Sequence, residues 1–224
     1  MDSIEALCDN PRVTLRKGGV FDPEGQCVVY WMQRSQRALD NPALNLAIET
    51  ANLLKRPVVV FFSLIPNAHH ANRRHYQFML KGLQDVARGL RGRGVGFILR
   101  RFPDPTLLRF CSEVRPYIVV SDENPMAGAE RVKTRVAREI QVPFWTVDAD
   151  VIVPTRLLGK EHYAARTIRP KIHALLPKFL RPVTNPKARV PWKTFSNARA
   201  SIPDPSLPDG LSVDDATAPV SAQR

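Results

Sequence analysis

Short apolar segments alternate along this chain with stretches that carry apolar residues at helical spacing, and no other feature restricts the possible folds as much. The apolar segments are continuous and rich in β-branched and aromatic residues, which is typical of strands buried on both faces of a sheet. We predict strands at residues 27–32, 57–65, 95–100, 117–121 and 144–147. Between them, apolar residues recur at helical spacing at Ala43, Leu46, Ala47, Ala51 and Leu54, at Met79, Leu83, Val86 and Leu90, and at Ala129, Val132, Val136 and Ile140. We expect these residues to belong to the core.

The predicted helix starts share one dipeptide pattern, an Asn or Asp followed by proline, at Asn41-Pro42, Asp104-Pro105 and Asn124-Pro125. The side-chain oxygen at such a position accepts a hydrogen bond from a free backbone N–H, and proline fits the first helical position. Strands that alternate with helices in this way predict right-handed crossovers between parallel strands. We therefore predict an α/β fold with a doubly wound, five-stranded parallel sheet of the Rossmann-like kind.

The composition divides the chain into four parts. We predict an N-terminal extension at 1–24, the α/β domain at 25–155, a connector at 156–182 and a proline-rich tail at 183–224. The tail contains few large apolar residues beyond Trp192 and Phe195. A segment of this composition cannot bury enough apolar surface to form a core, so we expect the tail to be disordered and mobile.

The charge balance points to a polyanionic partner. The chain has 33 Lys and Arg against 21 Asp and Glu, a formal net charge of +12. Weak electrostatic binding to DNA is one explanation, and an arginine-rich surface that maintains solubility is the other. Three widely spaced cysteines suggest neither a disulfide framework nor a metal site. No apolar run is long enough to cross a membrane, and the first residues lack the basic start of a secretory signal, so we expect a cytoplasmic protein.

A doubly wound sheet binds ligands beyond the carboxyl ends of its strands, where the winding reverses. If the reversal follows the third strand, the crevice lies between the first and fourth strands, beside residues 32–37 and 121–124. No dinucleotide-binding glycine motif, phosphate-binding loop or catalytic triad is visible, and we predict no catalytic residue. Our candidates for the crevice lining are Trp31, Met32, Gln33, Arg34, Asn41 and Asp122.

Several of these residues also have a structural explanation. Trp31 and Met32 can end a buried strand, and Asn41 is already assigned as a helix cap. Arg34 and Arg37 can equally pair with a carboxylate or point into solvent.

Five segments carry a resemblance to a known family. Residues 30–37 (YWMQRSQR) and 40–44 (DNPAL) resemble the opening of class II DNA photolyases. Residues 75–83 (HYQFMLKGL) resemble the second helix of these proteins, and 147–154 (VDADVIVP) resemble the end of their α/β domain. The most specific segment, 163–172 (YAARTIRPKI), resembles their connector. The resemblance covers about residues 25–182, and Ser35 stands where many members have an acidic residue.

The resemblance implies that this chain is the N-terminal α/β antenna domain of such an enzyme. In the family, an antenna chromophore, commonly a deazaflavin in class II members, passes light energy to reduced FAD in a helical domain. The flavin then donates an electron that splits a cyclobutane pyrimidine dimer in DNA. We expect the FAD domain to be absent from this chain, a separate flavin-binding helical domain to be its partner, and the chain alone to be inactive. The alternative is a stand-alone antenna, interaction or nucleotide-binding α/β protein without catalysis.

Overall fold

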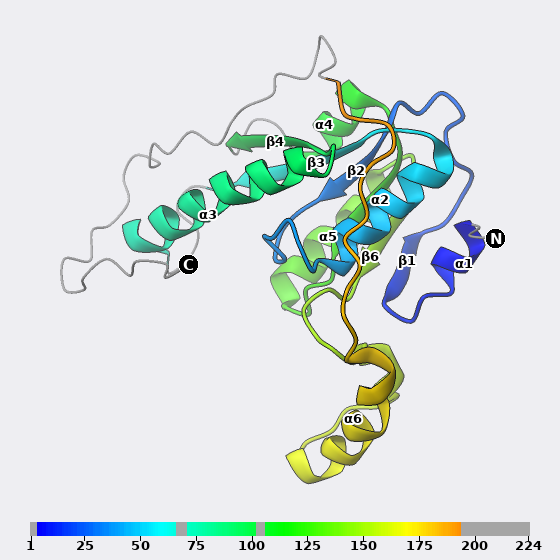
Figure 1. The fold of residues 1–224 in the computed structure, drawn as a ribbon, viewed down its shortest axis with the longest axis vertical. Coiled ribbons are helices and arrows are strands. Elements are labelled where there is room, and N and C mark those ends of the chain that lie inside the picture. The colour runs from blue at the N-terminus through cyan, green and yellow to red at the C-terminus, as the bar shows by residue number, and fades with distance from the viewer. Residues whose placement is uncertain (1–3, 66–70, 102–105, 194–224) are drawn as a thin grey trace.

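The structure is a computed structural model that describes residues 4–65, 71–101 and 106–193 (Figure 1). Its centre is a six-stranded sheet with the strand order β1-β6-β5-β2-β3-β4. The strands are β1 (Val13–Lys17), β2 (Cys27–Trp31), β3 (Val58–Leu64), β4 (Gly96–Arg101), β5 (Pro116–Asp122) and β6 (Phe144–Val147). The five strands from β2 to β6 are parallel, and the winding reverses between β2 and β5. The predicted doubly wound α/β fold is confirmed.

The strand count differs from the prediction because β1 joins the sheet as an antiparallel edge strand. β1 pairs with β6, with Val13 opposite Val147 and Leu15 opposite Trp145. Val13 is buried, whereas Leu15 is 51% exposed, and two basic residues end the strand. A five-residue edge strand with one buried side chain lacks the continuous apolar run that marked the central strands. The segment 1–24, which we expected to be an extension, therefore supplies a strand and the short helix α1 (Ile4–Cys8).

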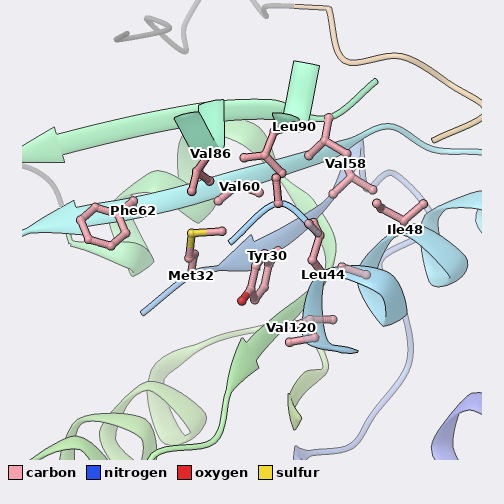
Figure 2. Close-up of a cluster of buried hydrophobic side chains, with 14 of the residues drawn as sticks. Tyr30, Met32, Leu44, Ile48, Val58, Val60, Phe62, Val86, Leu90 and Val120 are labelled. Atoms are coloured by element: carbon pink, nitrogen blue, oxygen red, sulfur yellow. The ribbon is translucent and has the colours of Figure 1, made fainter. Parts of the chain in front are cut away.

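Helices cover both faces of the sheet. They are α2 (Pro42–Leu54), α3 (Arg73–Gly92), α4 (Leu107–Val114) and α5 (Ala127–Glu139), followed by the 3₁₀ helix η1 (Thr155–Leu158) and by α6 (Ala165–Phe179). Figure 2 shows the core on one face, where Tyr30 of β2 and Met32, which follows this strand, lie among side chains of β3, α2 and α3. On the other face α4 and α5 pack against β2, β3 and β6, and the rings of Phe61 and Phe110 stack at 4.5 Å. None of the helices in the described ranges is long and apolar enough to cross a membrane.

The helix caps follow the dipeptide pattern only in part. Asn41 caps α2 as predicted, because its Oδ1 accepts a hydrogen bond from the amide of Leu44 at 3.1 Å. Asn124 does not cap α5, which begins at Ala127; its side chain accepts from the amide of Met126 at 3.1 Å and closes a turn before the helix. Asp104 lies outside the described residues, and the cap of α4 is Thr106.

The chain after β6 departs from the sheet and then returns to it. No residue of η1 or α6 is fully buried, and α6 projects away from the sheet (Figure 1, yellow). Residues 183–193, here called the return segment, then run back along α2 (Figure 1, orange). The Asn45 side chain donates to the carbonyl of Thr184 at 2.7 Å, and the Asn52 side chain donates to the carbonyl of Lys187 at 3.0 Å.

The end of the return segment is attached to the start of β4. The buried Arg93 guanidinium donates to the carbonyl of Pro186 at 2.9 Å, and the amide of Ala188 donates to the carbonyl of Arg93 at 2.9 Å. The Trp192 ring lies so close to Gly96 that an added Cβ would be 2.5 Å from it. Where we expected a disordered tail, residues 183–193 therefore pack on the domain. The partners lie about 90 to 140 positions away in sequence, so local composition does not reveal them. Residues 194–224 of the predicted tail lie outside the described residues.

Candidate functional site

Asp122, the last residue of β5, holds the loop that follows β2. Its Oδ2 accepts hydrogen bonds from the amides of Gln33 at 2.9 Å, Arg34 at 2.8 Å and Ser35 at 3.1 Å. Its Oδ1 accepts a hydrogen bond from the Tyr30 hydroxyl. Hydrogen bonds to a carboxylate are stronger than those between neutral groups, and Asp122 is only 1% exposed. We predicted that this carboxylate lines a ligand crevice, but it instead holds the loop after β2. Asp122, Tyr30 and the loop amides that Asp122 binds are here called the frame.

Asn41 completes this frame from the start of α2. Its Nδ2 lies within hydrogen-bond distance of three acceptors, the Tyr30 hydroxyl at 3.1 Å and the carbonyls of Ser35 at 2.9 Å and Arg37 at 3.1 Å. Burial, together with the neighbouring Asp122 carboxylate, raises the pKa of Tyr30 well above its usual value of 10.0. The Tyr30 phenol therefore stays protonated, and its O–H group remains available as a hydrogen-bond donor. This hydrogen-bond network fills the place between β2 and β5 where the winding of the sheet reverses.

Asp150 binds the outer side of the same loop. Arg34 pairs with Asp150 at 2.9 Å between Nε and Oδ2, and the Ser35 hydroxyl donates to its Oδ1 at 2.7 Å. Arg37 lies 3.8 Å from the same carboxylate and donates to the carbonyl of Ala149 at 2.6 Å. The carboxylate-pairing explanation for the two arginines is therefore the one that the structure supports.

A cavity of about 820 Å³ opens beside this frame, over the carboxyl ends of β2 and β3. Helices from both faces form its walls: α3 on one face, and α4 and α5 on the other. Most of the lining is apolar, including Phe62, Leu64, Tyr76, Met79, Leu107 and Val136. Polar groups are contributed by Gln33, Ser63, His75, Thr106, Arg135 and Glu139. An apolar cavity of this size with a few polar groups is typical of a site for a small organic ligand.

The structure brings all six predicted site residues to one end of the sheet but divides them between the cavity and the frame. Trp31, Met32 and Gln33 line the cavity, which lies one strand away from the predicted crevice. Asn41 and Asp122 are buried in the frame, and the Arg34 side chain is 47% exposed and paired with Asp150.

Several lining residues were not among our candidates. Met79, Ala129, Val132 and Val136 belong to helical stripes that we expected to be core, yet they line the cavity, and Val132 is 48% exposed. Spacing shows which side of a helix faces the sheet, but not where the sheet ends beneath it.

Comparisons with known proteins agree with the family suggested by the segment resemblances. Residues 28–188 match the model of the DNA photolyase family. A deoxyribodipyrimidine photo-lyase of Methanothermobacter thermautotrophicus is 38% identical over 174 residues, which cover 77% of this chain and 39% of that protein. The corresponding protein of Arabidopsis thaliana is 34% identical over 192 residues, covering 83% of this chain and 38% of that protein. This chain therefore spans about two fifths of the length of these relatives.

Among solved structures, a class III photolyase from Agrobacterium tumefaciens is similar with a TM-score of 0.46 and 21% identity, over 56% of this chain and 26% of that one. The family match extends over most of the chain and includes β2 to β6, η1, α6 and part of the return segment. The chain belongs to the DNA photolyase family.

Proposed function

We propose that this chain is the antenna part of a class II deoxyribodipyrimidine photolyase and that its cavity binds a deazaflavin chromophore. The observation that carries the proposal is the cavity of about 820 Å³ over the carboxyl ends of β2 and β3. The similarity to relatives named deoxyribodipyrimidine photo-lyase, at 38% and 34% identity, supports the assignment to this enzyme. The class is supported by the five segments described above, of which 163–172 is the most specific.

The lining suits a flat, fused-ring ligand. Apolar side chains from β2, β3 and three helices provide the walls, among them Trp31, Tyr76 and Leu107. Gln33, His75 and Arg135 provide polar contacts for the ring heteroatoms and for a polar side chain. A bound deazaflavin would absorb light and pass the energy to a flavin.

The repair reaction requires that flavin. We propose that a helical flavin-binding domain holds the reduced FAD and that DNA is the substrate, as the names of the relatives suggest. In this arrangement the chain positions the antenna and contributes to DNA binding. Its own side chains do not carry the electron transfer, which belongs to the cofactor.

A substitution that fills the cavity tests the proposal. Gly128 lines the cavity and has open space around it, so Gly128→Phe would place a ring where the ligand is proposed to lie. The matched control is Gly82→Phe, a helical glycine of α3 that also has open space around it and does not line the cavity. In absorbance titrations with a deazaflavin, we expect Gly128→Phe to weaken binding at least about tenfold and Gly82→Phe to leave it unchanged within about twofold.

A second pair of variants tests which loop residues contact the ligand. Gln33→Ala removes a lining side chain and should weaken deazaflavin binding, whereas Arg34→Ala removes a side chain that pairs with Asp150 and does not line the cavity. Equal binding by the wild type and by Gly128→Phe would refute the location of the site. No binding by the wild type would refute the chromophore.

A further inference from the structure

Residues 155–183, here called the basic arm, are attached to the domain at both ends. At the start, the Asp148 carboxylate accepts hydrogen bonds from the amide of Thr155 at 2.9 Å and from its hydroxyl at 2.8 Å. At the end, the Asn45 side chain holds the carbonyl of Thr184 at 2.7 Å. Between these points α6 projects away from the sheet (Figure 1). The arm is therefore a protrusion held at its base.

The arm carries half of the net charge of the chain. It contains seven Lys and Arg and one acidic residue, Glu161, and the whole chain has a formal net charge of +12. The seven basic residues are Arg156, Lys160, Arg166, Arg169, Lys171, Lys178 and Arg181. Half of the net positive charge is thus concentrated in an eighth of the chain.

Several cations of the domain are held by partners within the protein. In the domain, Arg16 pairs with Glu130 at 2.8 Å, Arg100 pairs with Glu113, and Arg93 binds backbone carbonyls. On α6, Arg166 and Arg169 are exposed and form no ion pair within the part of the chain that the structure describes. Lys178 is likewise exposed and only lies over the ring of its neighbour Phe179, at 5.5 Å.

The apolar side of α6 faces the protein. Ile168, Ile172 and Phe179 are half-buried, whereas the basic residues of the helix are exposed, and α6 packs against η1. A helix that binds a lipid surface needs its apolar side free for the membrane. All charged side chains of α6 are instead basic and exposed, which suits the phosphate backbone of a nucleic acid.

We propose that the basic arm is a contact surface for the phosphate backbone of DNA and that Arg166, Arg169 and Lys178 contribute to it. This inference rests on the proposed function, since it assigns a place on the chain to the DNA contact. The contact is independent of sequence and of damage, because phosphates are the same at every position.

The test compares two triple variants of the whole 224-residue chain by fluorescence anisotropy with a labelled DNA duplex, at 50 to 200 mM KCl. The arm variant is Arg166→Ala, Arg169→Ala and Lys178→Ala. The control is Arg73→Ala, Lys81→Ala and Arg91→Ala, three exposed residues of α3 whose loss changes the net charge equally. We expect the arm variant to weaken binding at least about tenfold at 50 mM KCl and to reduce the salt slope by about 0.9 per lost phosphate contact. The control should change the affinity by less than about threefold.

Circular dichroism of both variants checks that the fold is retained. Equal weakening by the two variants would show that only net charge matters and would overturn the proposal, as would unchanged binding by the arm variant. Loss of binding to phosphatidylserine vesicles with DNA binding unchanged would assign the arm to lipid instead. A deazaflavin titration of the same proteins keeps the two proposals separate, because the cavity contains none of the substituted residues.

Discussion

A single buried carboxylate, Asp122, organises the loop between β2 and α2. Its carboxylate accepts hydrogen bonds from three backbone amides and from the Tyr30 hydroxyl. Asp122 is only 1% exposed, so water cannot take its place as the acceptor. Sequence reasoning placed Asp122 at the correct end of the sheet as a candidate ligand contact. The structure shows that its hydrogen-bonding capacity is used within the protein.

At this scale we predict that Asp122→Asn destabilises the protein by about 2–4 kcal/mol, because an amide nitrogen replaces one acceptor and faces backbone donors. Urea denaturation measures the change. The control is Asp150→Asn, which breaks a partly exposed pair with Arg34 and should cost at most about 1 kcal/mol. An equal loss of unfolding free energy in the two variants would show that Asp122 does not hold the loop.

At the scale of elements, the return segment and the start of β4 stabilise each other. Arg93 connects three segments, since its guanidinium donates to the carbonyls of Ala38 at 2.6 Å and Pro186 at 2.9 Å and to the Asn45 side chain at 2.7 Å. Lysine has one nitrogen and cannot reproduce this planar arrangement. The return segment therefore depends on one buried arginine as well as on the Trp192 ring against Gly96.

We predict that Arg93→Lys loosens the return segment and lowers the free energy of unfolding by about 2 kcal/mol. Hydrogen exchange at the amides of Ala188 and Trp192, which bond to the carbonyls of Arg93 and Gly94, should become faster. Arg91→Lys is the control, because Arg91 is exposed two residues earlier and should change stability by less than about 0.5 kcal/mol. Unchanged exchange in Arg93→Lys would mean that the segment is held by other contacts.

At the scale of the whole molecule, the cavity, the return segment and the basic arm lie at different places around one sheet. The cavity lies at the carboxyl ends of β2 and β3, and the arm projects beyond the end of β6. In the proposed photolyase, the cavity would hold the chromophore and the basic arm would contact DNA. The chain spans about two fifths of the length of these relatives.

We predict that the purified chain, supplied with reduced FAD and light, does not remove pyrimidine dimers from an oligonucleotide. Electron donation to the dimer requires a flavin held next to it, and the side chains of this chain have no equivalent redox chemistry. Adding a helical flavin domain from a class II photolyase should restore light-dependent repair. The measurement is the light-dependent loss of dimers in both mixtures. Repair by the chain alone would refute the division of labour proposed here.

The sequence by itself determined the five parallel strands of the sheet. All five parallel strands were predicted to within two residues at each end, because strands buried on both faces are continuous apolar runs that need no distant partner to be recognised. The Asn41 cap was predicted for the same reason, since its bond to Leu44 is local. The family segments, too, are contiguous in sequence.

Only the tertiary structure decided what each polar side chain does. Asp122 and Asn41 bind the loop after β2, Arg34 pairs with Asp150 more than 100 positions away, and residues 183–193 find their partners on α2 and at Arg93. The edge strand β1 likewise depends on β6. Hydrogen bonds and cavities join residues that are distant in sequence, and a local pattern records which side chains are polar but not which of them meet.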